Sequence, residues 1–458
     1  MSALFLADIG TLVTMVPGQP PLRDVSLLIE GGRIKAIGRD LVVPPGARVI
    51  SGRDRVVYPG FVNTHHHLYQ TLTRNVPKVQ NAKLFDWLVG LYEVWRELDT
   101  EAVEISTRVG IGELLLSGCT TTTDHFYVFP KKAPAEFLDV EIETALNLGI
   151  RFHPTRGSMS RGRSQGGLPP DDVVQDPDTI LRDCERVIRK YHDPAPFSAC
   201  RVALAPCSPF SVTTELLRDT ITFARQHQVQ CHTHLCETRD EEAYCLHAHG
   251  LRPLDYLEQC GWLGSDVWFA HGIYFNDAEI DRLARSGTGI AHCPTSNLRL
   301  GSGIAPVPRM LDAGVRVGLA VDGSASNDSS NLARELQTAL LVHRVGTAVD
   351  AMPAQRVLEM ATTGGARILG RSEIGQIKPG MAADLAMFRL DRIEYAGAMA
   401  DPASAILFCG AGPRADYTIV AGRVLVEQGQ LVGVDESRLF HRANQVAARM
   451  LQAAEDAL

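Results

Sequence analysis

The chain has 458 residues, of which 45% are hydrophobic and 21% charged, and its formal net charge is −8 at pH 7. This is an ordinary globular composition, and the length suits a large barrel with an accessory domain. The mildly acidic balance, without a basic stripe, argues against a nucleic-acid partner. The sequence has no run of about 18 uncharged apolar residues, so we expect no membrane partner either.

Ten cysteines are scattered along the sequence without a C-x-x-C pair. A chain of this size needs no disulfides to stabilise it, so reduced thiols in the cytoplasm are the simplest interpretation. The first residues, "MSALFLADIG", carry Asp8 and lack a basic start followed by a long apolar run. We therefore expect no signal peptide and predict a cytoplasmic location.

Both ends of the sequence have a β-rich character. Within residues 1–57, "VSLLIEGGRIKAIG" places two apolar runs around Gly31 and Gly32, a pattern typical of a hairpin. Within residues 371–433, "GQIKPGMAADLAMFRL" and "DYTIVAGRVLVEQGQLVG" repeat this pattern. We predict that these two segments form one small β-sandwich domain, and that residues 434–458 form a C-terminal amphipathic helix.

Residues 58–370 alternate apolar β-like runs with helical stretches, which is typical of a parallel α/β fold. The eight candidate strands are "YPGFVNTHH", "TTTTDH", "GIRFHPT", "RVALAPC", "VQCHTHL", "VWFAHG", "GTGIAHC" and "RVGLAVD". Eight such units favour a (β/α)8 TIM-type barrel over an open sheet. Polar residues lie at the ends of these runs, where the catalytic loops of a barrel emerge.

Three consecutive histidines close the first candidate strand. Because strand side chains alternate between faces, His65 and His67 should point the same way and His66 the opposite way. Two inward imidazoles at the mouth of a barrel are a natural start for a metal site. Surface histidines at a polar strand end are the alternative, but they do not account for the further possible ligands at later strand ends.

The fifth candidate strand ends in "CHTHLCET". His232 and His234 share one face, and Glu237 follows three residues after His234. Imidazole suits zinc or iron, and a nearby carboxylate that is not a ligand can move protons. For His232 a satisfied core histidine is the stronger interpretation, whereas His234 is better explained as a ligand.

Two further ionisable residues end later strands, His271 in "VWFAHG" and Asp322 in "VGLAVDG". Alone, each would more often be structural, as a buried histidine with a backbone partner or an aspartate that caps a helix. Together with the histidines they place ionisable groups on strands one, five, six and eight. Only barrel closure brings those strand ends together, and a cation is the obvious reason to gather them.

In this order, "PGFVNTHHH", "HTHLCET", "FAHG", "AHCPTSNLRLGSG" and "AVDGSASND" resemble the motifs of the amidohydrolase superfamily. "GGRIKAIG", "GQIKPGMAADLAMF" and "VAGRVLVEQG" resemble its split β-domain, so the resemblance covers essentially the whole chain. It implies one divalent metal ion, zinc before iron. The metal ligands that the resemblance implies are His65, His67, His234 and Asp322.

The resemblance also implies three catalytic residues, with Glu237 as proton shuttle, His271 orienting the attacking water and Asp322 accepting its proton. Members with two metals usually have a carboxylated lysine at the end of strand four, and "RVALAPCSPF" has none, which resembles the one-metal deaminase branch. A bound metal lowers the pKa of water from about 15.7 to roughly 7. Glu237 can then protonate the ring nitrogen and the leaving amine, which favours an amino over a halide leaving group.

Four side chains are candidates for substrate binding. Gln70 offers a donor and an acceptor to a lactam edge, although it can also be a polar residue at a helix start. Trp87 can stack on a flat ring, although core packing explains it equally well. His125 and Arg156 end the second and third strands, where charged loop residues more often simply face water.

"THHHLYQTLTRNVP" and "TTTTDHFYVFP" resemble bacterial 8-oxoguanine deaminases, which are similar to hydroxyatrazine ethylaminohydrolases and pterin deaminases. The resemblance implies hydrolytic deamination of a small nitrogen heterocycle, with 8-oxoguanine placed before a triazine or a pterin. A non-catalytic barrel that serves as an assembly protein is the alternative from another class, and the intact ligand set argues against it. We also expect a homo-oligomer.

Overall fold

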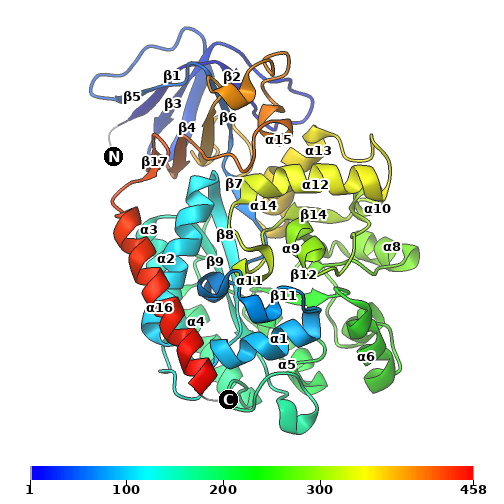
Figure 1. Cartoon of the computed structure of the whole chain (residues 1–458). Helices are drawn as coiled ribbons and strands as arrows, with labels where there is room; N and C mark the ends of the chain where they lie inside the picture. Colours follow the sequence, from blue (N-terminus) through cyan, green and yellow to red (C-terminus); the bar gives the residue numbers. More distant parts are fainter. Residues whose placement is uncertain (1–2, 457–458) are drawn as a thin grey trace.

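The computed structural model describes residues 3–456 as a barrel that carries a smaller β-domain (Figure 1). The barrel strands are β7 (Phe61–Asn63), β8 (Cys119–Phe126), β9 (Arg151–Ser158), β10 (Ala203–Pro206), β11 (Gln230–Leu235), β12 (Val267–His271), β13 (Gly289–His292) and β14 (Arg316–Leu319). They are parallel and follow one another in chain order. Each overlaps one of the eight candidate segments, so the predicted (β/α)8 fold is confirmed.

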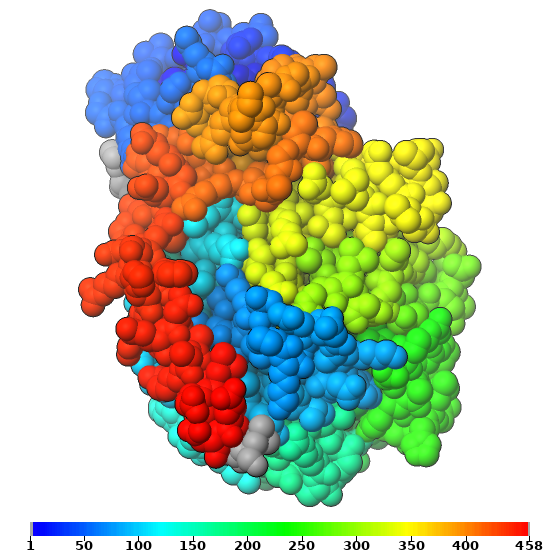
Figure 2. Space-filling model, in the orientation of Figure 1, coloured from blue at the N-terminus to red at the C-terminus, as the bar shows by residue number. Residues whose placement is uncertain are grey.

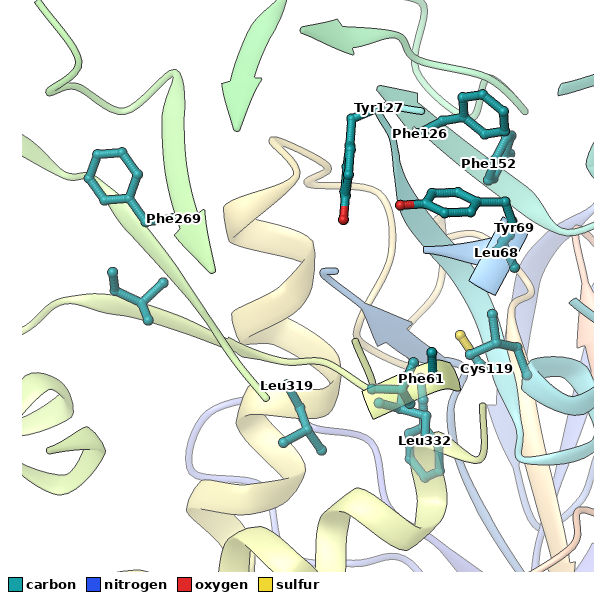
Figure 3. Packing of buried hydrophobic residues seen from close by; sticks show 14 of the residues in the cluster. Phe61, Leu68, Tyr69, Cys119, Phe126, Tyr127, Phe152, Phe269, Leu319 and Leu332 are labelled. Atoms are coloured by element: carbon teal, nitrogen blue, oxygen red, sulfur yellow. The ribbon is translucent and has the colours of Figure 1, made fainter. Parts of the chain in front are cut away.

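The barrel closes through backbone hydrogen bonds just beyond its first and last strands. Thr64 N donates to Leu319 O over 3.1 Å, and Asp322 N donates to His65 O over 3.1 Å. Phe61 and Leu319 of these two strands belong to a large buried hydrophobic cluster that also includes residues of the surrounding helices (Figure 3). Closure therefore places His65 and Asp322 side by side, although 257 positions separate them in the sequence.

Helices surround the barrel. They are α1 (Leu84–Trp95), α2 (Thr100–Leu116), α3 (Phe137–Leu148), α4 (Pro177–Tyr191), α5 (Thr214–Gln226), α6 (Arg239–His249), α7 (Pro253–Gln259), α8 (Asp277–Ser286), α9 (Pro294–Arg299), α10 (Val307–Asp312), α11 (Ser324–Asn327), α12 (Leu332–Gly346), α13 (Ala354–Glu359) and α14 (Gly365–Ile368). Short turns are η1 (Leu68–Thr73), η2 (Pro77–Val79), η3 (Arg163–Gln165), η4 (Met360–Gly364) and η5 (Ile393–Tyr395). None of the helices in the described part of the chain combines the length and the apolar composition that a membrane crossing requires.

Both ends of the chain build the small domain, as expected, and Figure 2 shows them together as one lobe on the barrel. One sheet has the order β4 (Arg33–Gly38), β3 (Val25–Glu30), β1 (Leu4–Ile9), β5 (Arg48–Ser51). The other has the order β18 (Gln430–Leu431), β17 (Arg423–Glu427), β16 (Tyr417–Val420), β15 (Leu385–Arg389), β6 (Arg55–Pro59), β2 (Thr11–Leu12). The hairpin β3–β4 turns at Gly31 and Gly32, whose φ angles of 58° and 77° favour glycine.

The small domain joins the barrel between β6 and β7. Strand β6 pairs with β15 as far as Pro59, and the barrel begins at β7. At the other end, α15 (Ala405–Phe408) belongs to the segment between β15 and β16. The C-terminal helix α16 (Glu436–Asp456) runs back along the barrel and packs on α2 (Figure 1).

A buried ion pair ties the barrel to the small domain. Arg151 of β9 donates from Nε to Asp384 Oδ2 over 2.6 Å and from Nη2 to Oδ1 over 3.2 Å, and each side chain is only 3% exposed. Asp384 also accepts from Ala421 N over 2.7 Å. Since both charges are removed from water, the loss of one leaves the other uncompensated.

Asp384→Ala is therefore expected to lower the free energy of unfolding by about 3–5 kcal/mol, measured by urea denaturation. Asp391→Ala is the matched control, because Asp391 pairs with Arg389 at the surface, where both side chains are about 40% exposed. Surface pairs contribute little, so this variant should lose much less stability. Equal losses in the two variants would contradict a stabilising role for the buried pair.

Candidate metal centre

Three histidine nitrogens and one carboxylate oxygen converge at the carboxyl ends of the barrel strands. His67 Nε2 lies 3.1 Å from His234 Nε2. Asp322 Oδ1 lies 3.2 Å from His65 Nε2 and 3.4 Å from His67 Nε2. All four side chains are buried. The first strand, the fifth and the last thus meet here, as the sequence pattern predicts.

Hydrogen bonds at the far side of the rings fix which nitrogen faces the centre. His67 Nδ1 lies 2.7 Å from the carbonyl oxygen of His125, and His234 Nδ1 lies 2.6 Å from that of Cys207. A carbonyl oxygen can only accept, so both Nδ1 atoms carry the proton. The neutral rings consequently direct the Nε2 lone pair to the centre.

His65 reaches the same state through His232. His232 Nδ1 donates to the carbonyl oxygen of Trp268 over 2.9 Å, so its Nε2 accepts from His65 Nδ1, 2.7 Å away. The proton of His65 is therefore on Nδ1, and its buried Nε2 has no hydrogen-bond partner within residues 3–456. His232 is the core histidine that the sequence favours, stacked on Trp268 at 4.4 Å between ring centroids, and it also orients His65.

These lone pairs repel one another unless a positive charge lies between them. Burial lowers the pKa of His234 to about 3 and that of His65 well below its usual value, so protonation of these rings does not supply the charge. Three imidazole nitrogens and a carboxylate oxygen are typical ligands of zinc and iron. The residues present fit one divalent metal ion, which His65, His67, His234 and Asp322 could hold.

Glu237 and His271 lie beside this group of ligands. His271 Nε2 lies 3.5 Å from Glu237 Oε2 and 3.9 Å from Asp322 Oδ2. Burial raises the pKa of Glu237 to about 7. Burial lowers the pKa of His271, but the carboxylates of Glu237 and Asp322 outweigh it, so the pKa is above its usual value. A carboxyl group with a pKa near 7, such as that of Glu237, can exchange a proton at neutral pH and suits acid–base catalysis.

The chain leaves the barrel at these positions in a left-handed backbone conformation. Cys236, which precedes Glu237, has φ 55°, His271 has φ 72°, and Asp322 has φ 66°. For residues other than glycine this conformation costs on the order of 1–3 kcal/mol, and it is concentrated at functional sites.

A narrow cavity of about 30 Å³ lies next to the ligand group. Gln70 and Trp87 line it, together with Tyr127 and Phe210. Gln70 Oε1 and Trp87 Nε1 are buried without a hydrogen-bond partner in the described part of the chain. Since an unpaired buried polar atom is costly, these two atoms suit a polar heterocyclic ligand.

The structure does not bring His125 or Arg156 to the wall of this cavity. His125 Nε2 donates to Ala205 O over 2.8 Å, and its ring lies against that of His234, 4.8 Å between centroids. Arg156 is bound from Nε to Asp183 over 2.5 Å, and its guanidinium lies over the Phe129 ring. Neither side chain is among those that line the cavity, and both bond to partners inside the fold. The substrate contacts expected of His125 and Arg156 stay predictions.

Two polar neighbours of the site were not predicted. Ser296 Oγ donates to Asp322 Oδ2 over 2.6 Å, and Asn297 Oδ1 accepts from His271 Nδ1 over 2.9 Å. Both lie in "AHCPTSN", which is part of one of the motifs that resemble the amidohydrolase superfamily. The motif signalled importance, but only the folded barrel shows which side chains it reaches.

A closed parallel barrel with histidines and carboxylates gathered at the carboxyl ends of its strands is the architecture of a metal-dependent hydrolase. The family model of the amidohydrolase family matches residues 56–425. The chain belongs to the amidohydrolase family.

The chain is similar over nearly its whole length to characterised members. It is 47% identical to the 8-oxoguanine deaminase of Pseudomonas aeruginosa, over 93% of this chain and 94% of that one. It is 38% identical to the hydroxydechloroatrazine ethylaminohydrolase of Pseudomonas sp. (strain ADP), over 98% and 96%. The crystal structure of the atrazine chlorohydrolase from Arthrobacter aurescens TC1, complexed with zinc, matches with a TM-score of 0.92 and 35% identity, over 97% of this chain and 100% of that chain.

His232→Phe tests the orientation of His65. The variant keeps a ring against Trp268 but removes the acceptor for His65 Nδ1, so we expect zinc affinity to fall about 10- to 100-fold, as is usual for partners of metal ligands. Competition with a chromophoric chelator measures the affinity. His153→Phe is the control, since His153 is also buried beside Trp268, 6.2 Å between centroids. Unchanged affinity in His232→Phe would remove this role.

Proposed function

We propose that this amidohydrolase deaminates a nitrogen heterocycle, preferably 8-oxoguanine, to urate and ammonia. The observation that carries the deaminase assignment is Glu237, a buried carboxyl with a raised pKa of about 7 at the wall of the cavity beside the ligand group. The identity of 47% to an 8-oxoguanine deaminase, against 38% to the ethylaminohydrolase, supports the substrate. A triazine or a pterin on the same scaffold is the alternative.

One divalent metal ion, zinc before iron, is proposed to bind to His65, His67, His234 and Asp322. When bound, it would acidify a water molecule for attack on the substrate. The segment "RVALAPCSPF" offers no lysine that could bridge a second ion. The zinc in the related chlorohydrolase structure supports the choice of metal. The buried, intact donor set argues against a non-catalytic assembly protein.

The side chains around the cavity divide the proton transfers. Asp322 accepts a proton from the attacking water, and His271 Nε2, between the two carboxylates, holds that water in line. Glu237 donates a proton to the ring nitrogen beside the attacked carbon, and a proton then passes through it to the departing amine. A carbon–oxygen bond forms, the carbon–nitrogen bond breaks, and ammonia leaves.

Gln70 and Trp87 are proposed to hold the heterocycle. The carboxamide of Gln70 can pair with a lactam edge, and Trp87 offers an N–H donor as well as a ring face. Gly323 leaves the space that Gln70 needs, because a Cβ at this position would lie 1.9 Å from Gln70 Oε1.

The cytoplasmic location and the homo-oligomer remain predictions, as do the domain limits 1–57, 58–370, 371–433 and 434–458. All ten cysteines are free thiols, which supports a reducing compartment. The proposed partner is a small heterocycle.

Glu237→Gln is expected to lower kcat by about 100-fold or more, the usual scale of lost acid–base catalysis. The fold and one equivalent of metal per chain should be retained, because Glu237 is not among the ligands. Steady-state kinetics, circular dichroism and elemental analysis measure these quantities. Glu258→Gln, at a partly exposed pair with Arg282, is the control. A near wild-type rate in Glu237→Gln would exclude it from the mechanism.

The substrate is tested by comparing kcat/KM for 8-oxoguanine, guanine, isoxanthopterin and hydroxyatrazine at identical zinc loading. We expect 8-oxoguanine to have the highest kcat/KM of the four, in line with the identity of 47% to an 8-oxoguanine deaminase. A tenfold preference for hydroxyatrazine or the pterin would overturn the substrate but leave the metal centre intact. If none of the four releases ammonia or amine, the deaminase proposal fails.

A further inference from the structure

The residues Ser296 and Asn297 are buried, yet they belong neither to the ligand group nor to the wall of the cavity. They lie in α9, which begins at Pro294, two residues after His292 ends β13. Proline suits the first turn of a helix because it lacks an N–H that would be unpaired there. The helix therefore starts at once, and these two side chains stay close to the strand ends.

Each of the two side chains reaches a different neighbouring strand. Strand β13 lies between β12 and β14 in the barrel, and successive residues of a helix point about 100° apart. Asn297 turns to His271 at the end of β12, and Ser296 turns to Asp322 beyond β14. One short helix thus contacts two groups of the proposed mechanism from behind.

The two hydrogen bonds determine which atoms of His271 and Asp322 point towards the site. The amide oxygen of Asn297 accepts the proton on His271 Nδ1, so His271 Nε2 is directed to Glu237 and Asp322. The hydroxyl of Ser296 donates a hydrogen bond to Oδ2 of Asp322, while Oδ1 of Asp322 points to His65 and His67.

The backbone geometry explains why such support is needed. The backbones of His271 and Asp322 are both in the left-handed conformation. Such a conformation persists only where surrounding contacts hold the residue in place. Side-chain hydrogen bonds from α9 supply that constraint at both positions.

Helix α9 is itself fixed by the buried carboxylate of Glu335 on α12. Glu335 accepts from Thr295 N over 3.0 Å and from Asn327 Nδ2 over 3.0 Å. Asn327 Nδ2 also donates to the carbonyl oxygen of Val321, 2.6 Å away, directly before Asp322. The helix and the segment that carries Asp322 therefore share one anchor.

We infer that Ser296 and Asn297 are a pair of positioning residues that hold Asp322 and His271 in their active orientations. The inference rests on the proposed function for the roles of Asp322 and His271. The pair contacts neither the substrate cavity nor the metal ligands' common centre, and acts only through the two side chains that it binds.

Asn297→Leu keeps the size of the side chain but removes the acceptor, whereas Asn297→Asp keeps an acceptor oxygen. We expect kcat to fall about 10- to 100-fold in Asn297→Leu, with KM within threefold of wild type, and to be at least tenfold higher in Asn297→Asp than in Asn297→Leu. Proton NMR should lose the downfield Nδ1–H signal of His271 in Asn297→Leu, with the signal assigned from its absence in His271→Ala. Equal kcat in the two variants, or a retained signal, would overturn the role of Asn297.

Ser296→Ala is expected to weaken zinc binding about tenfold in chelator competition, because Asp322 loses one of the bonds that orient it. Asn276→Ala is the stability control, since Asn276 is an exposed cap of α8 far from this pair in the sequence and outside its hydrogen bonds. It should lower the melting temperature without changing zinc affinity or kcat. Unchanged zinc affinity in Ser296→Ala would overturn its role. Zinc affinity and the NMR signal need no substrate, so they test the pair even if the proposed deaminase activity fails.

Discussion

Lone pairs that point at one buried volume are the constraint on which this molecule depends. His65, His67 and His234 each present Nε2, and Asp322 presents Oδ1. The His67–His234, His65–Asp322 and His67–Asp322 pairs of these atoms are 3.1–3.4 Å apart. In water such groups would turn away or take up protons. Here burial disfavours the protonated rings, and every ring is held from behind, so the geometry favours a cation between them.

The same logic extends outward from the ligands to the fold. The acceptors behind the rings of His67 and His234 are backbone carbonyl oxygens in or just beyond neighbouring strands. Behind His65 the acceptor is His232, which itself donates to the carbonyl oxygen of Trp268 within β12. Strand register therefore sets ring orientation. The hydrogen bond from Asp322 N to His65 O closes the barrel and sets the spacing of two proposed ligands at once. Stability and chemistry share these contacts, which is why polar residues are tolerated deep in the interior.

The sequence was informative wherever a residue's role follows from its own strand. The alternation of side chains along a strand predicted that His65 and His67 share a face. The position of Asp322 at the end of a strand predicted that it lies close to these histidines. It was uninformative wherever the partner comes from elsewhere in the chain. Arg156 forms an ion pair with Asp183 of the following helix, and no residue pattern around Arg156 predicts that pairing. Which residues the side chains of "PTSN" contact depends on which strands lie beside β13. The order of the strands in the closed barrel determines this.

The relatives release different groups, since their names describe a deaminase, an ethylaminohydrolase and a chlorohydrolase. A metal centre built on strand ends can serve all of these reactions, because attack on the ring carbon is the shared step. Other residues must then recognise the ring and the leaving group. The residues that we propose for this lie after β7, where η1 carries Gln70 and α1 carries Trp87, and beyond β11, where Glu237 lies at the cavity. Since η1 and α1 bear none of the proposed ligands, the substrate can change through substitutions there while the ligand set is kept.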